Sequence, residues 1–168
     1  VEGGVVRAIN IPGGAGLTRS EIEFLTERAM GYGAKGMAWI ALRPDGELYS
    51  VLTKYFTEEE RRELLELCGA KAGDFILFCA DKLPTVRRTL GGLRLDIAQL
   101  LKLPREGYCF LFVTDFPEFE YSEEEGRYLA MHHPFTMPYE EDIPFLLTQP
   151  ERVRAQAYDV VLNGVELG

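Results

Sequence analysis

Two acidic residues near the C-terminal end, Asp159 and Glu166, stand on either side of an Asn-Gly pair. Asn-Gly between alternating apolar residues is the strongest short-range signal for a hairpin with a two-residue turn. With Asn163-Gly164 as the turn, Val161 lies opposite Glu166. Asp159, two residues before Val161, then lies on the same face. The sequence therefore predicts that the two carboxylates are diagonal neighbours, with Cβ atoms about 5–8 Å apart.

A close pair of carboxylates can bind a cation. The two groups repel each other unless one is protonated or a cation lies between them. Mg²⁺ takes few protein carboxylates and keeps water or phosphate oxygens in its shell, so this pair suits Mg²⁺ bound together with a nucleotide. The alternative is that the hairpin simply presents a polar edge to solvent.

The only two histidines, His132 and His133, are adjacent. In an extended segment neighbouring side chains point to opposite faces, so one metal ion does not explain the pair. Pro134 favours extended backbone at His133. We expect one imidazole to face a site and the other to pack or hydrogen-bond beneath it.

A glycine-rich loop, Gly13-Gly14-Ala15-Gly16, precedes a predicted helix. Such a loop can hold an anion at a helix start. This one lacks the Lys-Ser/Thr of a P-loop and the spacing of a dinucleotide fingerprint, so a structural turn is the favoured interpretation.

The charge is unevenly distributed. Residues 115–168 carry 12 of the 27 acidic residues and three of the 18 basic ones, so the whole net charge of −9 lies in the last third. This shift indicates two parts with different roles, and it argues against a nucleic-acid surface within 115–168 alone. The run Glu123-Glu124-Glu125 fits a solvated loop. Apolar residues make up 46% of the chain, which suits a globular protein, and no apolar run is long enough to span a membrane.

The three cysteines (Cys68, Cys79 and Cys109) form no C-x-x-C pair and lie in apolar stretches. They are expected to be buried thiols of a reducing compartment, so neither a disulfide scaffold nor a zinc ribbon is expected. The expected location is cytoplasmic.

Residues 1–104 alternate strands and helices without a repeated β-α-β period, which predicts an α+β fold, a two-layer sandwich. The expected strands are 4–11, 36–42, 47–55 and 75–80; the expected helices run from Thr18 or Ser20 to about Tyr32, from a capping box at Thr57 onward, and from Thr85 to Leu101. The second helix should turn Leu64, Leu67 and Cys68 inward; the third should bury Val86, Leu90, Leu93, Ile97 and Leu100.

A boundary is expected at residues 104–107, which gives two domains, 1–104 and 105–168. Within the second we expect a central apolar strand in 108–116, an irregular polar stretch over 116–138, a short helix near 139–147, and two final strands in 157–163 and 164–168.

Two sequence elements resemble a known family. The segment 115–137 contains FPEFE followed by HHPFT, and 155–168 reads AQAYDVVLNGVELG. Both are similar to hallmark elements of bacterial-type aspartyl-tRNA synthetases, FP-x-FE with HHPFT, and YD-x-V-x-NG-x-E-hydrophobic-G. Residues 1–104, with IPGG, GAKGMAW and GDFILFCADK, resemble the GAD insertion domain of these enzymes, which some amidotransferase subunits share. The second domain then corresponds to part of a class II catalytic domain, built on an antiparallel sheet.

The resemblance implies roles for three residues. His132 matches a mobile histidine near the aspartate substrate. Asp159 and Glu166 match carboxylates that bind Mg²⁺ and ATP during formation of aspartyl-adenylate. The implied activity is that of an aspartate–tRNA ligase, with aspartate, ATP and tRNA as partners and a homodimeric parent enzyme.

The sequence departs from the family in extent, because the anticodon-binding domain, the dimer motif and the arginine-bearing motifs are not among these 168 residues. Adenylate formation needs such cations. The chain is therefore expected to be an inactive piece of the ligase. The alternative is a non-catalytic GAD-type module that contacts tRNA or a protein, as in amidotransferase subunits. Helix 85–101 and its flanks carry basic residues that fit either a weak phosphate-binding face or a solvated surface: Arg87, Arg88, Arg94, Lys102 and Arg105.

Overall fold

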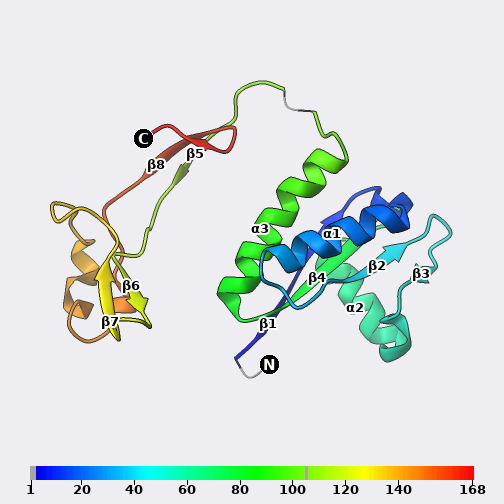
Figure 1. Cartoon of the computed structure of the whole chain (residues 1–168), viewed down its shortest axis with the longest axis horizontal. Helices are drawn as coiled ribbons and strands as arrows, with labels where there is room; N and C mark the ends of the chain where they lie inside the picture. Colours follow the sequence, from blue (N-terminus) through cyan, green and yellow to red (C-terminus); the bar gives the residue numbers. More distant parts are fainter. Residues whose placement is uncertain (1–2, 105) are drawn as a thin grey trace. The chain divides into compact units, whose positions relative to one another are not determined.

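The computed structural model describes residues 3–104 and 106–168. The chain divides into two compact units, Val1–Pro104 and Arg105–Gly168, called unit 1 and unit 2 below (Figure 1). Each unit is considered by itself.

Unit 1 is built on a four-stranded antiparallel sheet. Its strands are β1 (Val5–Ile11), β2 (Ala38–Leu42), β3 (Leu48–Tyr49) and β4 (Phe75–Asp81), arranged in the order β1-β4-β2-β3. β4 pairs with β1 along all seven residues and with β2 on its other side. Its residues Phe75, Ile76 and Leu77 are all buried, because this position between β1 and β2 covers both faces of the strand there.

Three helices flank this sheet: α1 (Arg19–Gly31), α2 (Glu58–Cys68) and α3 (Leu83–Leu100). Two short 3₁₀ turns, Gly14–Gly16 and Thr53–Tyr55, complete the unit. Both α1 and α2 begin with a reciprocal capping box. The side chains of Thr18 and Thr57 accept from the backbone N–H three residues on, and the carboxylates of Glu21 and Glu60 accept from the backbone N–H of the two threonines. The sequence signals at Thr18 and Thr57 are thus confirmed.

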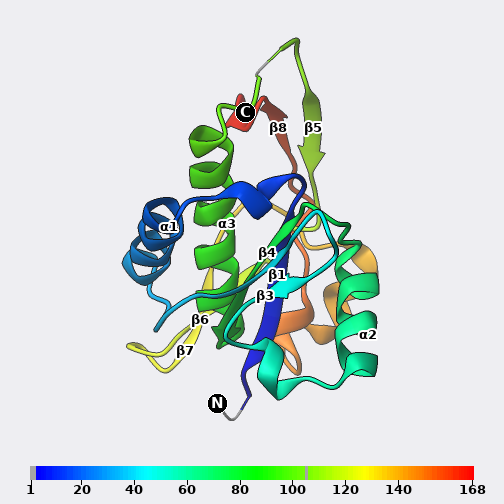
Figure 2. The same ribbon diagram turned by 90° about the vertical axis from the view of Figure 1, so that its right-hand side faces the viewer.

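The core lies on both faces of the sheet. Side chains of β4 at odd positions, including Phe75 and Leu77, pack with α1 and α3, whereas Ile76 and Phe78 pack with α2. Figure 2 shows α1 and α3 on one side of the sheet and α2 on the other. The α+β class is confirmed, and α2 adds a layer that the two-layer prediction lacked.

Two details of the prediction for unit 1 were wrong. The strand expected over 47–55 contains only the two residues of β3, and a 3₁₀ turn follows it. In α2, Leu67 is 87% exposed, and Leu65 instead joins Leu64 and Cys68 against the sheet. The apolar positions 64, 65 and 68 form one stripe on a helix, and Leu67 falls outside it.

Of the two adjacent glycines in α3, Gly91 and Gly92, packing requires a glycine only at position 92. A Cβ on Gly92 would overlap the ring of Tyr32, at the end of α1, whereas a Cβ on Gly91 would meet nothing within 4 Å. The Tyr32 ring is held in place, because its hydroxyl donates to Asp96 and accepts from Arg28.

This difference gives a matched pair of variants. Gly91→Ala should stabilise unit 1 by about 1 kcal/mol, because alanine favours helix. Gly92→Ala should destabilise it by about 1–3 kcal/mol, because the methyl group must displace the pinned ring. Urea unfolding followed by the fluorescence of Trp39, the one tryptophan in the sequence, measures both. A stabilising Gly92→Ala would contradict the packing argument.

The glycine-rich loop is a structural turn. Gly13 has φ 71° and donates its N–H to Asp74, while the N–H of Ala15 donates to the carbonyl of Gly73. A Cβ on Gly14 would lie 2.9 Å from Ile11. These backbone donors are therefore used within the protein, as the structural interpretation predicted.

Unit 2 contains two small antiparallel sheets. Strands β5 (Phe110–Val113), β8 (Asp159–Leu162) and β9 (Val165–Glu166) form the first, and β6 (Phe119–Ser122) and β7 (Arg127–Ala130) form the second. Two 3₁₀ segments, η3 (Glu140–Phe145) and η4 (Pro150–Arg152), cover the region of the predicted helix and the residues after it.

Two predictions for unit 2 were wrong. The strand β5 was expected to be central, yet it lies at the edge of its sheet with all four residues exposed, and β8 is central. The stretch 116–138 was expected to be irregular, yet it contains the β6–β7 hairpin. The acidic run Glu123-Glu124-Glu125 forms the turn of this hairpin, with Gly126 at φ 64°.

The cysteines differ in burial. Cys79 is buried and Cys68 is half-buried, and burial raises the pKa of both thiols. Cys109 is exposed, which corrects the prediction that all three are buried. All three are free thiols. In the described ranges, 3–104 and 106–168, the helices are too short or too polar to cross a bilayer.

Candidate functional site

The C-terminal hairpin has the predicted register. Leu162 pairs with Val165 and Val161 pairs with Glu166. Asn163 and Gly164 form the turn with φ 49° and 83°, as a two-residue turn of type I′ requires. Asp159 lies two residues before Val161, so its side chain and that of Glu166 leave the same face of the ribbon.

The hairpin is anchored by Asn163. Its side-chain oxygen accepts from the N–H of Cys109 at 2.8 Å, and its amide donates to the carbonyl of Gly107 at 3.1 Å. Its own N–H donates to the carbonyl of Cys109. Sequence reasoning treated Asn163 only as a turn residue and missed this link to the segment before β5. The link holds the turn, and with it the spacing of the two carboxylates.

Both carboxylates are available to a ligand. Asp159 is half-buried and Glu166 is exposed, and neither makes a side-chain hydrogen bond or ion pair with the part of the chain that the structure describes. Within residues 3–104 and 106–168, no group of three or more His, Cys, Asp or Glu side chains could hold a metal ion. The hairpin thus offers two carboxylates, which suits a cation whose other ligands are water or phosphate oxygens.

His132 lies where the HHPFT and FPEFE motifs of the segment 115–137 contact each other. Its Nε2 is 3.1 Å from the carbonyl oxygen of Pro117, and its ring packs edge-on against Phe116 with centroids 5.7 Å apart. The N–H of Met131 donates to the carbonyl of Glu118. HHPFT is therefore held against FPEFE by backbone and imidazole contacts.

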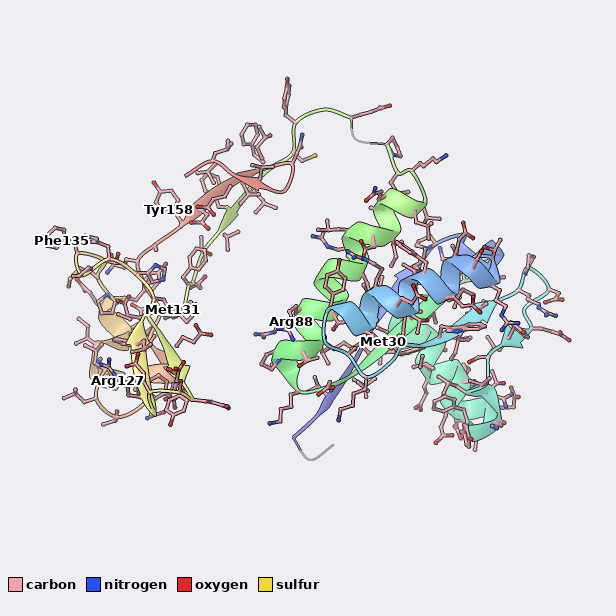
Figure 3. All side chains as sticks on the ribbon, viewed as in Figure 1. Met30, Arg88, Arg127, Met131, Phe135 and Tyr158 are labelled. Atoms are coloured by element: carbon pink, nitrogen blue, oxygen red, sulfur yellow. The ribbon has the colours of Figure 1, made fainter. Side chains whose placement is uncertain are left out.

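His133 has a different environment. It is exposed, and its Nδ1 accepts from the N–H of Phe135 at 3.3 Å. The two rings are tilted at 59° to each other, with centroids 4.8 Å apart. Phe135 is 87% exposed and points away from the rest of unit 2 (Figure 3). Of the pair, His132 contacts residues distant in the sequence, Phe116 and Pro117, whereas His133 contacts Phe135, two residues on.

An ion cluster that sequence reasoning missed is centred on Arg154. Its guanidinium donates to Asp142 at 2.8 and 3.1 Å, to Glu141 at 3.0 Å and to Asp115 at 3.2 Å. The N–H of Arg154 also donates to Asp142, and its guanidinium lies over the ring of Tyr139. Arg154 therefore connects η3 to the segments on either side of the β6–β7 hairpin. The one available signal was that Arg154 is one of three basic residues in a strongly acidic segment.

These contacts have consequences for pH and stability. Hydrogen bonds from Arg154 hold the pKa of Asp142 below its ordinary value. A depressed pKa means that the stabilisation is present above the unfolded value, about 3.9, and is lost as the pH falls through the folded one. Arg154→Gln should therefore lower the urea midpoint of unit 2 at pH 7, followed by far-UV circular dichroism, with little difference from wild type below pH 3.

A matched control is Arg127→Gln, which breaks an exposed ion pair with Glu125 in the β6–β7 turn. Exposed pairs contribute little, so its midpoint should stay near wild type. Equal effects of the two substitutions would contradict the role given to Arg154. Trp39 fluorescence, recorded in parallel, reports on unit 1 and so separates an effect there from one on unit 2.

The basic residues of α3 do not form one free face. The Nε of Arg88 donates to the backbone carbonyl of Tyr32 at 2.7 Å, so it provides a hydrogen-bond partner for a carbonyl at the C-terminal end of α1 (Figure 3). Arg87 and Arg94 are exposed. Arg105 lies outside the described residues. The phosphate-binding interpretation of this helix stays a prediction.

Comparison with known proteins identifies a family and several relatives that this chain resembles. The GAD domain family matches residues 1–90. The chain is 53% identical over 99% of its length to an aspartate–tRNA(Asp/Asn) ligase of Lachnoclostridium phytofermentans. It is 51% identical, again over 99% of its length, to an aspartate–tRNA(Asp/Asn) ligase of Anoxybacillus flavithermus and to an aspartate–tRNA ligase of Ruminiclostridium cellulolyticum.

The chain spans 28% of the length of each of these relatives. The similarity therefore covers both units of this chain and a limited part of each ligase. It includes the HHPFT segment and the hairpin that carries Asp159 and Glu166. Through residues 1–90, which form most of unit 1, the chain belongs to the GAD domain family.

Proposed function

We propose that this chain is part of an aspartate–tRNA ligase, which activates aspartate with ATP to aspartyl-adenylate and transfers it to tRNA. One observation carries the proposal: the register of the β8–β9 hairpin puts Asp159 and Glu166 on one face, in a chain about 50% identical to such ligases. Unit 2 then contributes part of a class II catalytic domain.

In this proposal Asp159 and Glu166 bind Mg²⁺ together with ATP. When bound, the ion would neutralise charge on the phosphate groups. Two carboxylates fill only part of an octahedral shell, which leaves positions for phosphate oxygens and water. The turn at Asn163-Gly164 and the anchoring of Asn163 fix the pair before the ligand arrives, so little ordering accompanies binding. The donor set and its rigid support suit this role.

His132 is proposed to line the aspartate site. Its ring rests on Phe116 and Pro117, contacts that orient the imidazole and that a small rotation could exchange for a substrate contact. The cytoplasmic location and the homodimeric state are further parts of the proposal, and both come from the family resemblance.

The isolated 168-residue chain is expected to give only background aspartate-dependent pyrophosphate exchange. Adenylate formation requires cations around the phosphates. In residues 106–168 the three arginines already have partners: Arg127 bonds Glu125, Arg152 bonds Gln149, and Arg154 bonds three carboxylates.

The exchange assay tests the proposal when a longer protein that includes this chain is assayed beside the chain itself. The longer protein should catalyse exchange with aspartate and not with other amino acids such as glutamate. Exchange with another amino acid alone would overturn the ligase assignment. Clear turnover by the 168-residue chain would overturn the argument about cations.

A further inference from the structure

The strand β1 leaves one side of the unit 1 sheet open. It lies at the end of the order β1-β4-β2-β3 and pairs with β4 along all seven of its residues. On the other side, alternate backbone N–H and C=O groups of β1 have no partner strand within the described residues. The sequence VVRAINI contains no proline, and such an edge accepts a further strand readily.

A groove of about 790 Å³ follows this open edge. Its walls come from β1, α2 and α3, which lie on either side of the strand (Figure 2). On the α2 side the groove is apolar, because Val6 and Leu67 are 69% and 87% exposed there and Leu64 lies beside them. Leu67 is the residue that does not contribute to the core of unit 1.

The α3 side of the groove has a different character. Side chains alternate along a strand, so Arg7 projects from β1 toward α3 while its neighbours Val6 and Ala8 project toward α2. Arg94 of α3 lines the same side. Neither arginine makes an ion pair or side-chain hydrogen bond within the described residues, and no acidic residue lines the groove. One wall is therefore apolar and the other is positively charged.

We infer that this groove binds an extended peptide segment of another protein, in which apolar and acidic residues alternate. The segment would pair with β1 as a fifth strand of the sheet. Its apolar side chains would contact Val6 and Leu67, and its carboxylates would contact Arg7 and Arg94. Because successive side chains of a strand point to opposite faces, every apolar residue of the peptide would face the apolar wall and every acidic residue the charged wall.

Other occupants fit this groove less well. In a second copy paired edge to edge, Arg7 and Arg94 would face the same arginines of the other copy. A nucleic-acid backbone would satisfy the arginines, but it would leave the strand edge of β1 without a pairing partner and would place phosphates beside Leu67. A peptide in which apolar and acidic residues alternate can pair with the open backbone groups of β1, cover the apolar wall and neutralise the two arginines at the same time.

The test is a titration of the ¹⁵N-labelled 168-residue chain with a nine-residue peptide in which valine and glutamate alternate. The expected result is a change in the amide signals of β1, α2 and α3, with slower hydrogen exchange along β1. A peptide of the same composition with its valines and glutamates in two blocks, and a valine–lysine peptide, should each bind at least about tenfold more weakly.

Two variants test the two walls. The double substitution Arg7→Glu with Arg94→Glu should reverse the preference, so that the lysine peptide binds better than the glutamate peptide. Leu67→Ser should weaken binding about tenfold, and because Leu67 is exposed the fold should persist, as Trp39 emission can verify. Arg19→Glu, at an exposed site on α1 away from the groove, is the matched charge control and should change nothing.

Several results would overturn the inference. Equal binding of the alternating, block and lysine peptides would show that neither wall discriminates. Signal changes outside β1, α2 and α3 would place the peptide elsewhere. Self-association of the chain that protects β1 amides, or displacement of the peptide by a single-stranded oligonucleotide with the same amides affected, would assign the groove to a second copy or to a nucleic acid.

Discussion

Replacing Asp159 by asparagine, or Glu166 by glutamine, is expected to slow aspartate-dependent pyrophosphate exchange by about 100-fold in the proposed ligase, a scale typical of losing one charge-stabilising group from an active site. Each substitution keeps the shape of the side chain and removes one negative charge from the hairpin face that both residues share. The variants should also need more Mg²⁺ for half-maximal rate, because one ligand of the ion is neutral.

The matched control for this pair is Glu124→Gln, which removes the same charge from the exposed turn of the β6–β7 hairpin. Its rate and Mg²⁺ dependence should equal those of the unchanged enzyme. If Asp159→Asn and Glu166→Gln left both quantities unchanged over a full Mg²⁺ titration, the hairpin would be the solvent-facing polar edge that the sequence also allowed.

The largest expected effect on stability belongs to Asp74, a buried carboxylate at the start of β4. It accepts hydrogen bonds from the side chain of Asn10 and from the backbone N–H groups of Gly13 and Lys71, at 2.9–3.0 Å. These bonds connect β1, the loop that follows it and the loop that precedes β4. Asp74→Asn turns an amide toward groups that are themselves donors, so unit 1 should lose about 2–3 kcal/mol of its free energy of unfolding.

The effect of Asp74 should depend on pH in a defined direction. The hydrogen bonds from Asn10, Lys71 and Gly13 hold its pKa below the ordinary value of an aspartate. The stabilisation is therefore complete above the unfolded pKa, about 3.9, and is lost as the pH falls through the lower pKa of the folded state. Wild type and Asp74→Asn should differ at pH 7 and converge at pH 2.

Urea unfolding monitored at Trp39 measures this difference. The indole stacks on Phe75, next to Asp74, with ring centroids 5.4 Å apart. Asp45→Asn is the control, since Asp45 accepts one exposed hydrogen bond in a turn and its loss should cost less than about 0.5 kcal/mol. A difference between wild type and Asp74→Asn that stayed constant down to pH 2 would mean that the charge of Asp74 contributes nothing.

Local signals in the sequence predicted the parts of the structure that local interactions determine. The capping boxes at Thr18 and Thr57, the buried stripe of α3 and the Asn163-Gly164 turn depend on residues a few positions apart. The position of Asp159 and Glu166 on one face of the hairpin could be predicted from that turn, because the register of a two-residue hairpin is set by the turn itself.

The features that were missed depend on residues far apart in the sequence. Arg154 contacts Asp115, 39 positions away, and no periodicity indicates such a pair. The position of β5 at a sheet edge follows from its pairing with β8 and not from its apolar character. The close approach of Gly92 to Tyr32, at the end of α1, joins positions 60 residues apart, and no local pattern indicates it.

The claim that Asp159 and Glu166 act on one shared ion is tested most directly by a double-mutant cycle on pyrophosphate exchange, with Asp159→Asn, Glu166→Gln and the two combined. Groups that hold the same ion act as a unit, so the double variant should be about as slow as the slower single variant. If the two losses instead multiply, the carboxylates act independently, and the shared-ion account of the hairpin is wrong.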